Sequence, residues 1–411
     1  MQTVSLSLEK LLKQSTCKLN KMLHHSSTSP FDLEEFVQIR RDIHKNPELG
    51  FDEYRTAKLV TEKLIQLGYS VKAGLGKTGV VGSLKRGKST KSIGLRADMD
   101  ALPIHEESAL KWRSEKNGVM HACGHDGHTA TLLAGAKLIA EDLDFDGTVN
   151  LIFQPAEEGG GGALRMMEDD LFTLFPCDAV FAMHNMPGLE EGVLAFRDGP
   201  MMASSDYASI KIIGIGGHGA MPHVAADPIV AAASIIMGLQ TIISRNVDPQ
   251  QTAVITVGAV HSGQANNVIP ASALLELSVR ALDPKLRALL EQRIKQLVRA
   301  QADSYGVEAQ ITWTPGYSVL VNSKEQTDFA RKVALEKFGL TKVELQTKAL
   351  SASEDFAFML ERVPGCYFLI GNGDGDSVGA CMVHNPQYEF SESIITTGAI
   401  FWKALVKEFL K

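Results

Sequence analysis

The chain has 411 residues, of which 45% are hydrophobic and 22% charged, and its formal net charge at pH 7 is −7. This composition is typical of a globular protein, and at this length a single hydrophobic core is rarely enough, so two domains are expected. The negative charge argues against nucleic acid or an acidic membrane surface as a partner, and no apolar run of about 18 residues indicates a membrane span.

The five cysteines are odd in number and have no spacing that predicts a disulfide framework. Scattered cysteines are typical of a reducing compartment, so we expect a cytoplasmic protein. Residues 1–30 contain four lysines and no arginine, and Ser5–Glu9 is too short and polar for a secretory signal. We interpret residues 1–30 as a partly helical N-terminal extension, with a mitochondrial-type leader as the alternative.

Helices and short strands follow one another after this extension. Helical spacing covers Phe36–Asn46 and Thr56–Leu67, and strands are expected at 69–71, 79–84 and 92–96. Between the last two strands, Gly82–Ser89 matches the phosphate-binding loop pattern G-x-x-x-x-G-K-[ST]. That mechanism needs a helix to begin at the lysine. Only two residues separate the pattern from the next strand, so we predict a hairpin tip instead.

Metal-binding side chains follow the ends of several strands. The nine residues Met120–His128 contain one cysteine, three histidines and one aspartate, and an Ala- and Leu-rich helix follows. Cys and His are ligands that zinc and its neighbours prefer, and a position ahead of a helix favours a thiolate over a thiol. Other candidate donors stand at three further strand ends: Asp98 and Asp100, Glu157 and Glu158, and His184. Because open α/β sheets gather such ends at one edge, we predict a metal site there.

The pattern changes near Ser204. Gly214–Gly219 matches the dinucleotide fingerprint G-x-G-x-x-G, but Pro222 follows too closely for a helix to begin at the third glycine, so we predict no NAD or FAD site. From Asp206 to Thr314 the expected order is strand, helix, strand, strand, helix, strand, with Asp227 as the cap of the first helix and Pro228 in its first turn. This is the order of a ferredoxin-like βαββαβ sandwich, inserted into the first domain.

The first domain is expected to resume near Tyr317. We predict a helix at Gln326–Phe338, a capping box at Ser351–Glu354 that begins a helix through Leu360, and a buried strand at Cys366–Ile370. A final amphipathic helix is expected at Ser391–Leu410.

Eight motifs in this order resemble the M20 peptidase family. The resemblance extends over about residues 35–411. Within the family, the motifs resemble the amidohydrolase branch of hippurate hydrolases, N-acyl-amino-acid deacylases (aminoacylases) and auxin-conjugate hydrolases. The motifs are Asp98–Pro103, His121–His128, Gln154–Gly159, Met183–Asn185, Gly217–His223, Asn267–Pro270, Ser353–Phe356 and His384–Pro386.

The resemblance implies two divalent metal ions, zinc, manganese, nickel or cobalt, with Glu157 as general base and acid. The implied metal ligands are Cys123, His125, Glu158, His184 and His384. All but His384 are also nominated by the strand-end argument. Since three protein donors plus water suffice for one catalytic zinc, five donors suit a pair of ions.

Further roles come from the same resemblance. His218 is expected to stabilise the oxyanion from the inserted domain of the same or a partner subunit, and Asn267 and Arg280 to grip a substrate carboxylate. Asp98 and Asp126 are expected to orient metal-bound imidazoles. Asp100 is interpreted only as the end of its strand.

Taken together, the sequence predicts an α/β protein with a catalytic domain (31–202 and 316–411), built on a mixed central sheet flanked by helices, and an inserted α+β lid and dimerisation domain (203–315). The expected function is hydrolysis of N-acyl amino acids by a metal-dependent homodimer. The alternatives are a P-loop nucleotide hydrolase, resting on Gly82–Ser89, and a metal-binding protein without catalysis. The acyl group, the amino acid and the native metal are left open.

Overall fold

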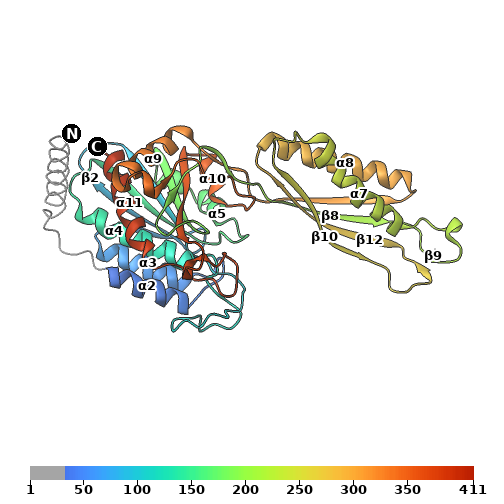
Figure 1. The fold of residues 1–411 in the computed structure, drawn as a ribbon, viewed down its shortest axis with the longest axis horizontal. Helices are drawn as coiled ribbons and strands as arrows, with labels where there is room; N and C mark the ends of the chain where they lie inside the picture. The colour runs from blue at the N-terminus through green and yellow to red at the C-terminus, as the bar shows by residue number, and fades with distance from the viewer. Residues whose placement is uncertain (1–32) are drawn as a thin grey trace, which may run out of the picture. The chain divides into compact units, whose positions relative to one another are not determined.

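The computed structural model describes residues 33–411, so the extension predicted at 1–30 lies outside the described residues. Their largest unit is a mixed sheet of eight strands flanked by helices (Figure 1). In spatial order the strands are β1 (Ser70–Leu75), β2 (Gly79–Arg86), β4 (Gly147–Gln154), β3 (Ser92–Asp98), β5 (Ala179–Pro187), β16 (Gly365–Gly373), β6 (Leu194–Ala195) and β15 (Val343–Glu344).

The central strands of this sheet are parallel and buried. β3 is parallel to both β4 and β5, and β16 is parallel to β5. Every residue of β3 and of β16 is buried, as expected for parallel strands that are covered on both faces. Because parallel neighbours end at the same edge, the loops that follow β3 and β4 come together there.

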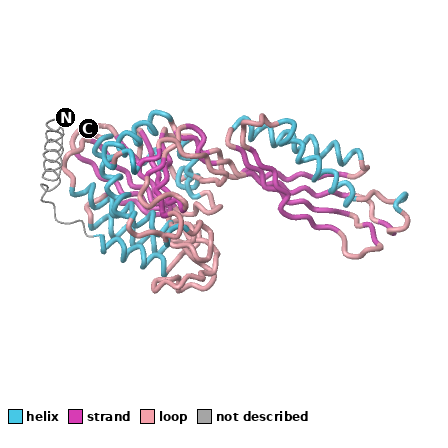
Figure 2. The backbone as a smooth tube through the Cα atoms, in the orientation of Figure 1, coloured by secondary structure: helices cyan, strands magenta, loops and turns pink. Residues whose placement is uncertain are grey.

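Helices cover this sheet and connect its strands (Figure 2). The longer ones are α2 (Leu33–Lys45), α3 (Tyr54–Gln66), α4 (His125–Glu141), α9 (Lys324–Phe338) and α11 (Ile394–Phe409); the shorter ones are α5 (Gly162–Glu168), α6 (Leu171–Leu174) and α10 (Phe356–Leu360). The capping box predicted at Ser351–Glu354 is wrong, because α10 begins at Phe356 with Asp355 as its N-cap. The Glu354 carboxylate accepts a hydrogen bond from the buried guanidinium of Arg96. This is a long-range contact that local sequence does not encode.

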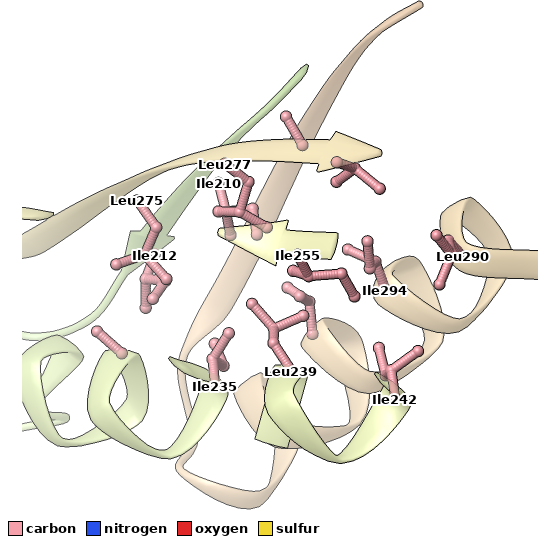
Figure 3. Close-up of a cluster of buried hydrophobic side chains, with 14 of the residues drawn as sticks. Ile210, Ile212, Ile235, Leu239, Ile242, Ile255, Leu275, Leu277, Leu290 and Ile294 are labelled. Carbon is pink, nitrogen blue, oxygen red and sulfur yellow. The ribbon is translucent and has the colours of Figure 1, made fainter. Parts of the chain in front are cut away.

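A second sheet, of four antiparallel strands, has the spatial order β10-β12-β8-β13. Along the chain its elements are β8 (Asp206–Ile213), α7 (Pro228–Asn246), β10 (Ala253–Ser262), β12 (Ser272–Ala281), α8 (Pro284–Ser304) and β13 (Glu308–Pro315). Isoleucine and leucine side chains from α7 and α8 pack against its strands (Figure 3). Two short pairs complete the described strands: β9 (Gly217–His218) with β11 (Val268–Ile269), and β7 (Gly199–Met202) with β14 (Leu320–Asn322).

The cap predicted for α7 is confirmed. Asp227 is extended, its carboxylate accepts the backbone N–H of Ile229 at 2.8 Å, and Pro228 occupies the first turn. Among residues 33–411, α7 is also the one helix long and apolar enough to cross a membrane by length and composition. The sequence predicted no such candidate, and the packing of α7 explains its apolar character, since Ile235, Leu239 and Ile242 are buried in the core of the second sheet.

Both nucleotide-binding patterns lack the helix that they need. β2 and β3 flank the turn at Gly87, and the N–H groups of Lys88 and Ser89 both donate to Asp146 Oδ1 at 2.6 Å. The groups that would face a phosphate are therefore already bound to a carboxylate. After Gly214–Gly219 the next α-helix, α7, begins only at Pro228.

Candidate metal centre

The five predicted metal ligands and Glu157 converge in the structure. Three overlapping groups each have donor atoms within 4.8 Å of one another: Cys123, His125 and His184; Cys123, Glu158 and His384; and His125, Glu157 and Glu158. Cys123 Sγ lies 3.4 Å from His184 Nε2, and His384 Nε2 lies 3.2 Å from Glu158 Oε1. Cys123 belongs to two of the groups, so its sulfur lies where it could be shared between two ions.

The ligands come from four segments of the chain. Cys123 precedes α4 across Gly124, whose φ is +90°, and a Cβ there would lie 2.4 Å from Tyr388 Oη. His125 is the first residue of α4, and Glu157 and Glu158 follow β4. His184 was predicted just beyond a strand ending at Met183, but β5 continues to Pro187 because it pairs with β16 along that length.

His384 reaches the site from a loop with an unusual backbone. Its φ of +66° is rare for a residue with a side chain. The backbone N–H of His384 donates to the carbonyl of Ala122 at 2.7 Å, which ties this loop to the segment that carries Cys123. In the absence of metal, hydrogen bonds with Cys123 and Glu158 raise the pKa of His384 to about 10. A bound cation would have to displace that proton.

The donor set fits divalent transition ions. His125 Nε2 is completely buried and has no hydrogen-bond partner, an arrangement that is costly unless something else binds the nitrogen. Burial, followed by the charge of Glu158, raises the pKa of the Cys123 thiol. The sequence predicted a thiolate favoured by the helix terminus, whereas burial opposes the charged form of this side chain. A metal ion would supply the missing positive charge.

The carboxylates around these ligands differ from the prediction. Asp100, which was interpreted only as a strand end, has Oδ1 3.2 Å from His125 Nδ1, and its Oδ2 accepts the N–H of Glu158 at 2.9 Å. Asp98 was expected to orient a metal-bound imidazole, but its closest imidazole is that of His128, with Oδ1 and Nδ1 2.6 Å apart. Its other oxygen lies 3.7 Å from His125 Nε2.

Asp126 contacts no metal-ligand imidazole among the described residues. Its Oδ2 lies 2.7 Å from Arg40 Nε and 2.9 Å from His44 Nδ1, both on α2. The expectation that Asp126 orients a ligand is therefore replaced by a buried ionic contact between α4 and α2. Sequence spacing could not reveal this pairing, because 82 residues separate His44 from Asp126.

Glu157 is 7% exposed and lies beside further carboxylates. Burial, and then the charges of Glu354 and Glu158, raise its pKa well above the usual range. The nearby Arg96 guanidinium is fully buried and donates to Asp98 at 2.7 Å and to Glu354 at 2.9 Å. A carboxyl group with a raised pKa is able to hold a proton near neutral pH, as an acid and base catalyst requires.

A cavity of about 580 Å³ opens onto these donors. It is lined by Cys123, Glu157, Glu158, His184 and His384, together with Arg280 from β12. The Arg280 guanidinium lies 3.4 Å from Ser353 Oγ and over the ring of Tyr207. The sequence had not linked either neighbour to Arg280.

His218 and Asn267 do not line this cavity. They lie next to each other on the β9 and β11 pair, where the N–H of Gly219 donates to the carbonyl of Asn267 at 2.8 Å. Both side chains are exposed. Of the three predicted substrate-binding residues, the structure thus brings only Arg280 to the metal ligands.

Comparisons with known proteins agree with this site. Residues 94–408 match the family described as peptidase family M20/M25/M40. Hippurate hydrolase from Campylobacter jejuni is 48% identical over 92% of this chain and 97% of its own, and N-acetyl-L-cysteine deacetylase from Bacillus subtilis is 37% identical over 92% and 88%. A solved structure from Bacillus subtilis, described as a dinuclear metal-binding peptidase of the M20 family, superposes with a TM-score of 0.80 at 31% identity and covers 92% of this chain and 98% of its own.

Proposed function

Since the chain belongs to peptidase family M20/M25/M40, we propose that it is a metal-dependent amidohydrolase that cleaves the amide bond of N-acyl amino acids. The observation that carries this proposal is the convergence of five donors on two groups that share Cys123, with Glu157 beside them. The names of the relatives, a hippurate hydrolase and N-acyl deacetylases, support the same class of substrate.

We assign the metal ligands to Cys123, His125, Glu158, His184 and His384, which would hold two divalent ions chosen from zinc, manganese, nickel and cobalt. Bound there, the pair would lower the pKa of water and polarise the amide carbonyl. Glu157 takes the proton from the attacking water and passes it to the leaving nitrogen. Its raised pKa suits both halves of this transfer, and its carboxylate is left out of the five assigned ligands.

Arg280 is assigned to the carboxylate of the amino acid. Its guanidinium lines the cavity, and a planar fork of donors matches a carboxylate. The inserted segment 203–315, with the strand order of a ferredoxin-like domain, serves as lid and dimerisation domain to the catalytic parts 31–202 and 316–411. We assign His218 and Asn267 to the site of a partner subunit in a homodimer, because neither lines the cavity formed by its own chain. We place the protein in the cytoplasm.

A substrate screen tests the activity. Purified protein is stripped with a chelator, reconstituted separately with zinc, manganese, nickel or cobalt, and offered benzoylglycine, N-acetyl amino acids and indole-acetyl conjugates while free amine is followed. We expect release of amino acid from at least one class, only in reconstituted samples. Release that is indifferent to the chelator, or no release from any acyl amino acid with any of the metals, would overturn the proposal.

Mixing two inactive variants tests the partner contribution. Subunits with His218→Ala supply an intact metal centre, and subunits with Glu157→Gln supply an intact His218. If the two complete each other's sites, co-refolded mixtures regain part of the wild-type turnover. A mixture as inactive as its components, or full activity in a monomer, would refute the assignment.

A further inference from the structure

Residues 155–162, the loop that carries Glu157 and Glu158, contain a strained backbone position. Ala156 has φ +49°, in the left-handed region that residues with a side chain seldom adopt. It directly precedes Glu157, so its backbone angles set the direction in which the two glutamates leave β4. Within the loop the N–H of Gly162 donates to the carbonyl of Ala156 at 3.1 Å, and such a conformation persists only where further contacts also hold it.

The connection between α2 and α3 supplies the contacts that do so. The backbone N–H of Ala156 donates to Glu53 Oε1 at 2.8 Å, and Glu53 Oε2 accepts the hydroxyl of Thr78 at 2.6 Å. Glu53 is 0% exposed. Gly50, in the same connection, lies against the Ala156 side chain so closely that a Cβ on Gly50 would be 3.0 Å from the Ala156 Cβ.

The usual explanation for an acidic residue at this position does not apply. Glu53 is the N-cap residue of α3, yet its side chain makes no capping hydrogen bond. Glu48 does that instead, since its carboxylate accepts the N–H groups of Arg55 at 3.0 Å and Thr56 at 2.9 Å. The helix therefore does not need the Glu53 carboxylate. Burying a carboxylate is costly, and burial raises its pKa to about 7.

The same connection is fastened to the other side of the metal centre. The N–H of Ala101 donates to the carbonyl of Glu48 at 2.8 Å. Ala101 follows Asp100, whose carboxylate accepts the N–H of Glu158 and lies beside His125. Residues 48–53 thus hold both Asp100 and Ala156 in place behind the metal ligands.

We propose that Glu53 is a positioning residue that holds Ala156 in the left-handed conformation and so sets the directions of Glu157 and Glu158. This inference rests on the proposed function, because it presupposes that Glu157 transfers the proton and Glu158 binds metal. Glu53 itself touches neither substrate nor metal.

The test compares kcat, KM and cobalt affinity in a set of variants. Glu53→Ala should lower kcat about 10- to 100-fold with less than about 3-fold change in KM, because Ala156 loses its partner and the loop leaves the active conformation. Cobalt should bind more weakly to the stripped protein, since Glu158 shares the loop. In Glu53→Gln the amide oxygen can accept the N–H of Ala156, and the amide N–H can donate to the Thr78 hydroxyl. Its kcat should therefore stay within about 3-fold of wild type.

Ala156→Gly provides the decisive second change. Glycine adopts a positive φ without strain, so in the Glu53→Ala background it should raise kcat about 10-fold and restore cobalt affinity, whereas in the wild-type background it should bring no gain. Glu62→Ala, an exposed change on the same helix, is the matched control. If Glu53→Ala does not fold, Glu53→Asp, which withdraws the carboxylate by one methylene, replaces it.

Two results would overturn the inference. One is wild-type kcat and cobalt affinity in Glu53→Ala. The other is a loss of kcat and cobalt affinity in Glu53→Ala that Ala156→Gly does not reverse and that Glu53→Gln also shows. That result would indicate a general loss of stability. Failure of the proposed function has a different signature, because the metal-reconstituted wild-type protein would then release no amino acid, whereas failure of the role of Glu157 would leave Glu157→Gln with wild-type turnover.

Discussion

The two sheets of this protein bury different kinds of side chain. The four-stranded sheet with α7 and α8 has an aliphatic core, and within residues 206–315 the one buried polar side chain is Asp206, at the start of β8, which accepts two hydrogen bonds from Arg287 of α8. Around the eight-stranded sheet, Arg40, Arg96, Asp98 and Asp126 are all completely buried. Buried charges are costly unless they are paired. The comparison teaches that polar burial is concentrated in the part of the chain that holds the metal ligands, where orientation matters more than stability.

Replacing Glu157 should separate chemistry from stability most clearly. Glu157→Gln removes the proton carrier while leaving the five ligands, so we expect kcat to fall about 1,000-fold with metal content unchanged. Steady-state kinetics and metal analysis of the same preparation check this. Glu168→Gln, a change to an exposed side chain of α5, is the control. Wild-type turnover in Glu157→Gln would remove the role assigned to it.

Cys123→Ser tests whether the shared sulfur binds metal. Loss of a donor should exceed the 10- to 100-fold effect typical of changes among residues that only orient ligands, so we expect cobalt affinity to fall at least about 100-fold. Calorimetric titration of the stripped protein with cobalt measures the affinity, and the sulfur-to-cobalt absorption band shows whether a thiolate binds the ion. Cys177→Ser, a change outside the cavity, should leave both the absorption band and the cobalt affinity intact. Equal titrations of Cys123→Ser and wild type would rule Cys123 out as a ligand.

Arg280 of β12 and Tyr207 of β8 are the residues of the second sheet that line the cavity. Arg280→Lys keeps the charge but loses the planar fork, so KM for an N-acyl amino acid should rise about 10-fold with little change in kcat. A substrate amide of the same compound, which lacks the carboxylate, should show no such difference between the two enzymes. Arg293→Lys, at a surface position of α8, is the control. A higher KM for both compounds alike would point to a packing defect instead.

The smallest effect concerns pH and the buried imidazole of His121. Burial lowers its pKa to about 4, so between pH 6.5 and 4 the unfolded chain binds a proton that the folded chain does not. Stability is therefore lost as pH falls through that window. From pH 7.5 to 5.0 the metal-free protein should lose about 2 kcal/mol through this group. His121→Gln should reduce the pH dependence of the unfolding free energy, measured by urea titration, by that amount. His105→Gln, a change to an exposed side chain, should not.

Much of the site could be predicted from local sequence. Cys123 and His125 stand in a cluster of Cys and His at the start of a helix. Glu157, Glu158 and His184 stand at or near the ends of strands that a short apolar pattern reveals, and parallel strands bring such ends together. His384 was found only through its resemblance to the M20 family, because nothing near it in sequence marks it as a ligand. The separation of His218 and Asn267 from the cavity formed by their own chain was left open by the sequence.

The partners of the ligands could not be predicted in the same way. Asp100 was passed over and Asp126 was assigned to the wrong neighbour, because an aspartate after a strand has the same local pattern whichever histidine it faces. Glu53 gave no signal, since an acidic residue before a helix is expected as a cap. Only its distance to Ala156, 103 residues away, reveals another role.

The amino-acid sequence by itself determined the helix cap at Asp227, the two-residue alternation of β8 and the candidate metal donors other than His384, because each depends on bonds, periodicity or side-chain chemistry within a few residues. Tertiary structure alone decided which carboxylate meets which imidazole, how Ala156 is held in its strained conformation and why Lys88 and Ser89 cannot hold a phosphate. These depend on contacts between segments far apart in the chain, whose geometry is set only when the sheets and helices pack.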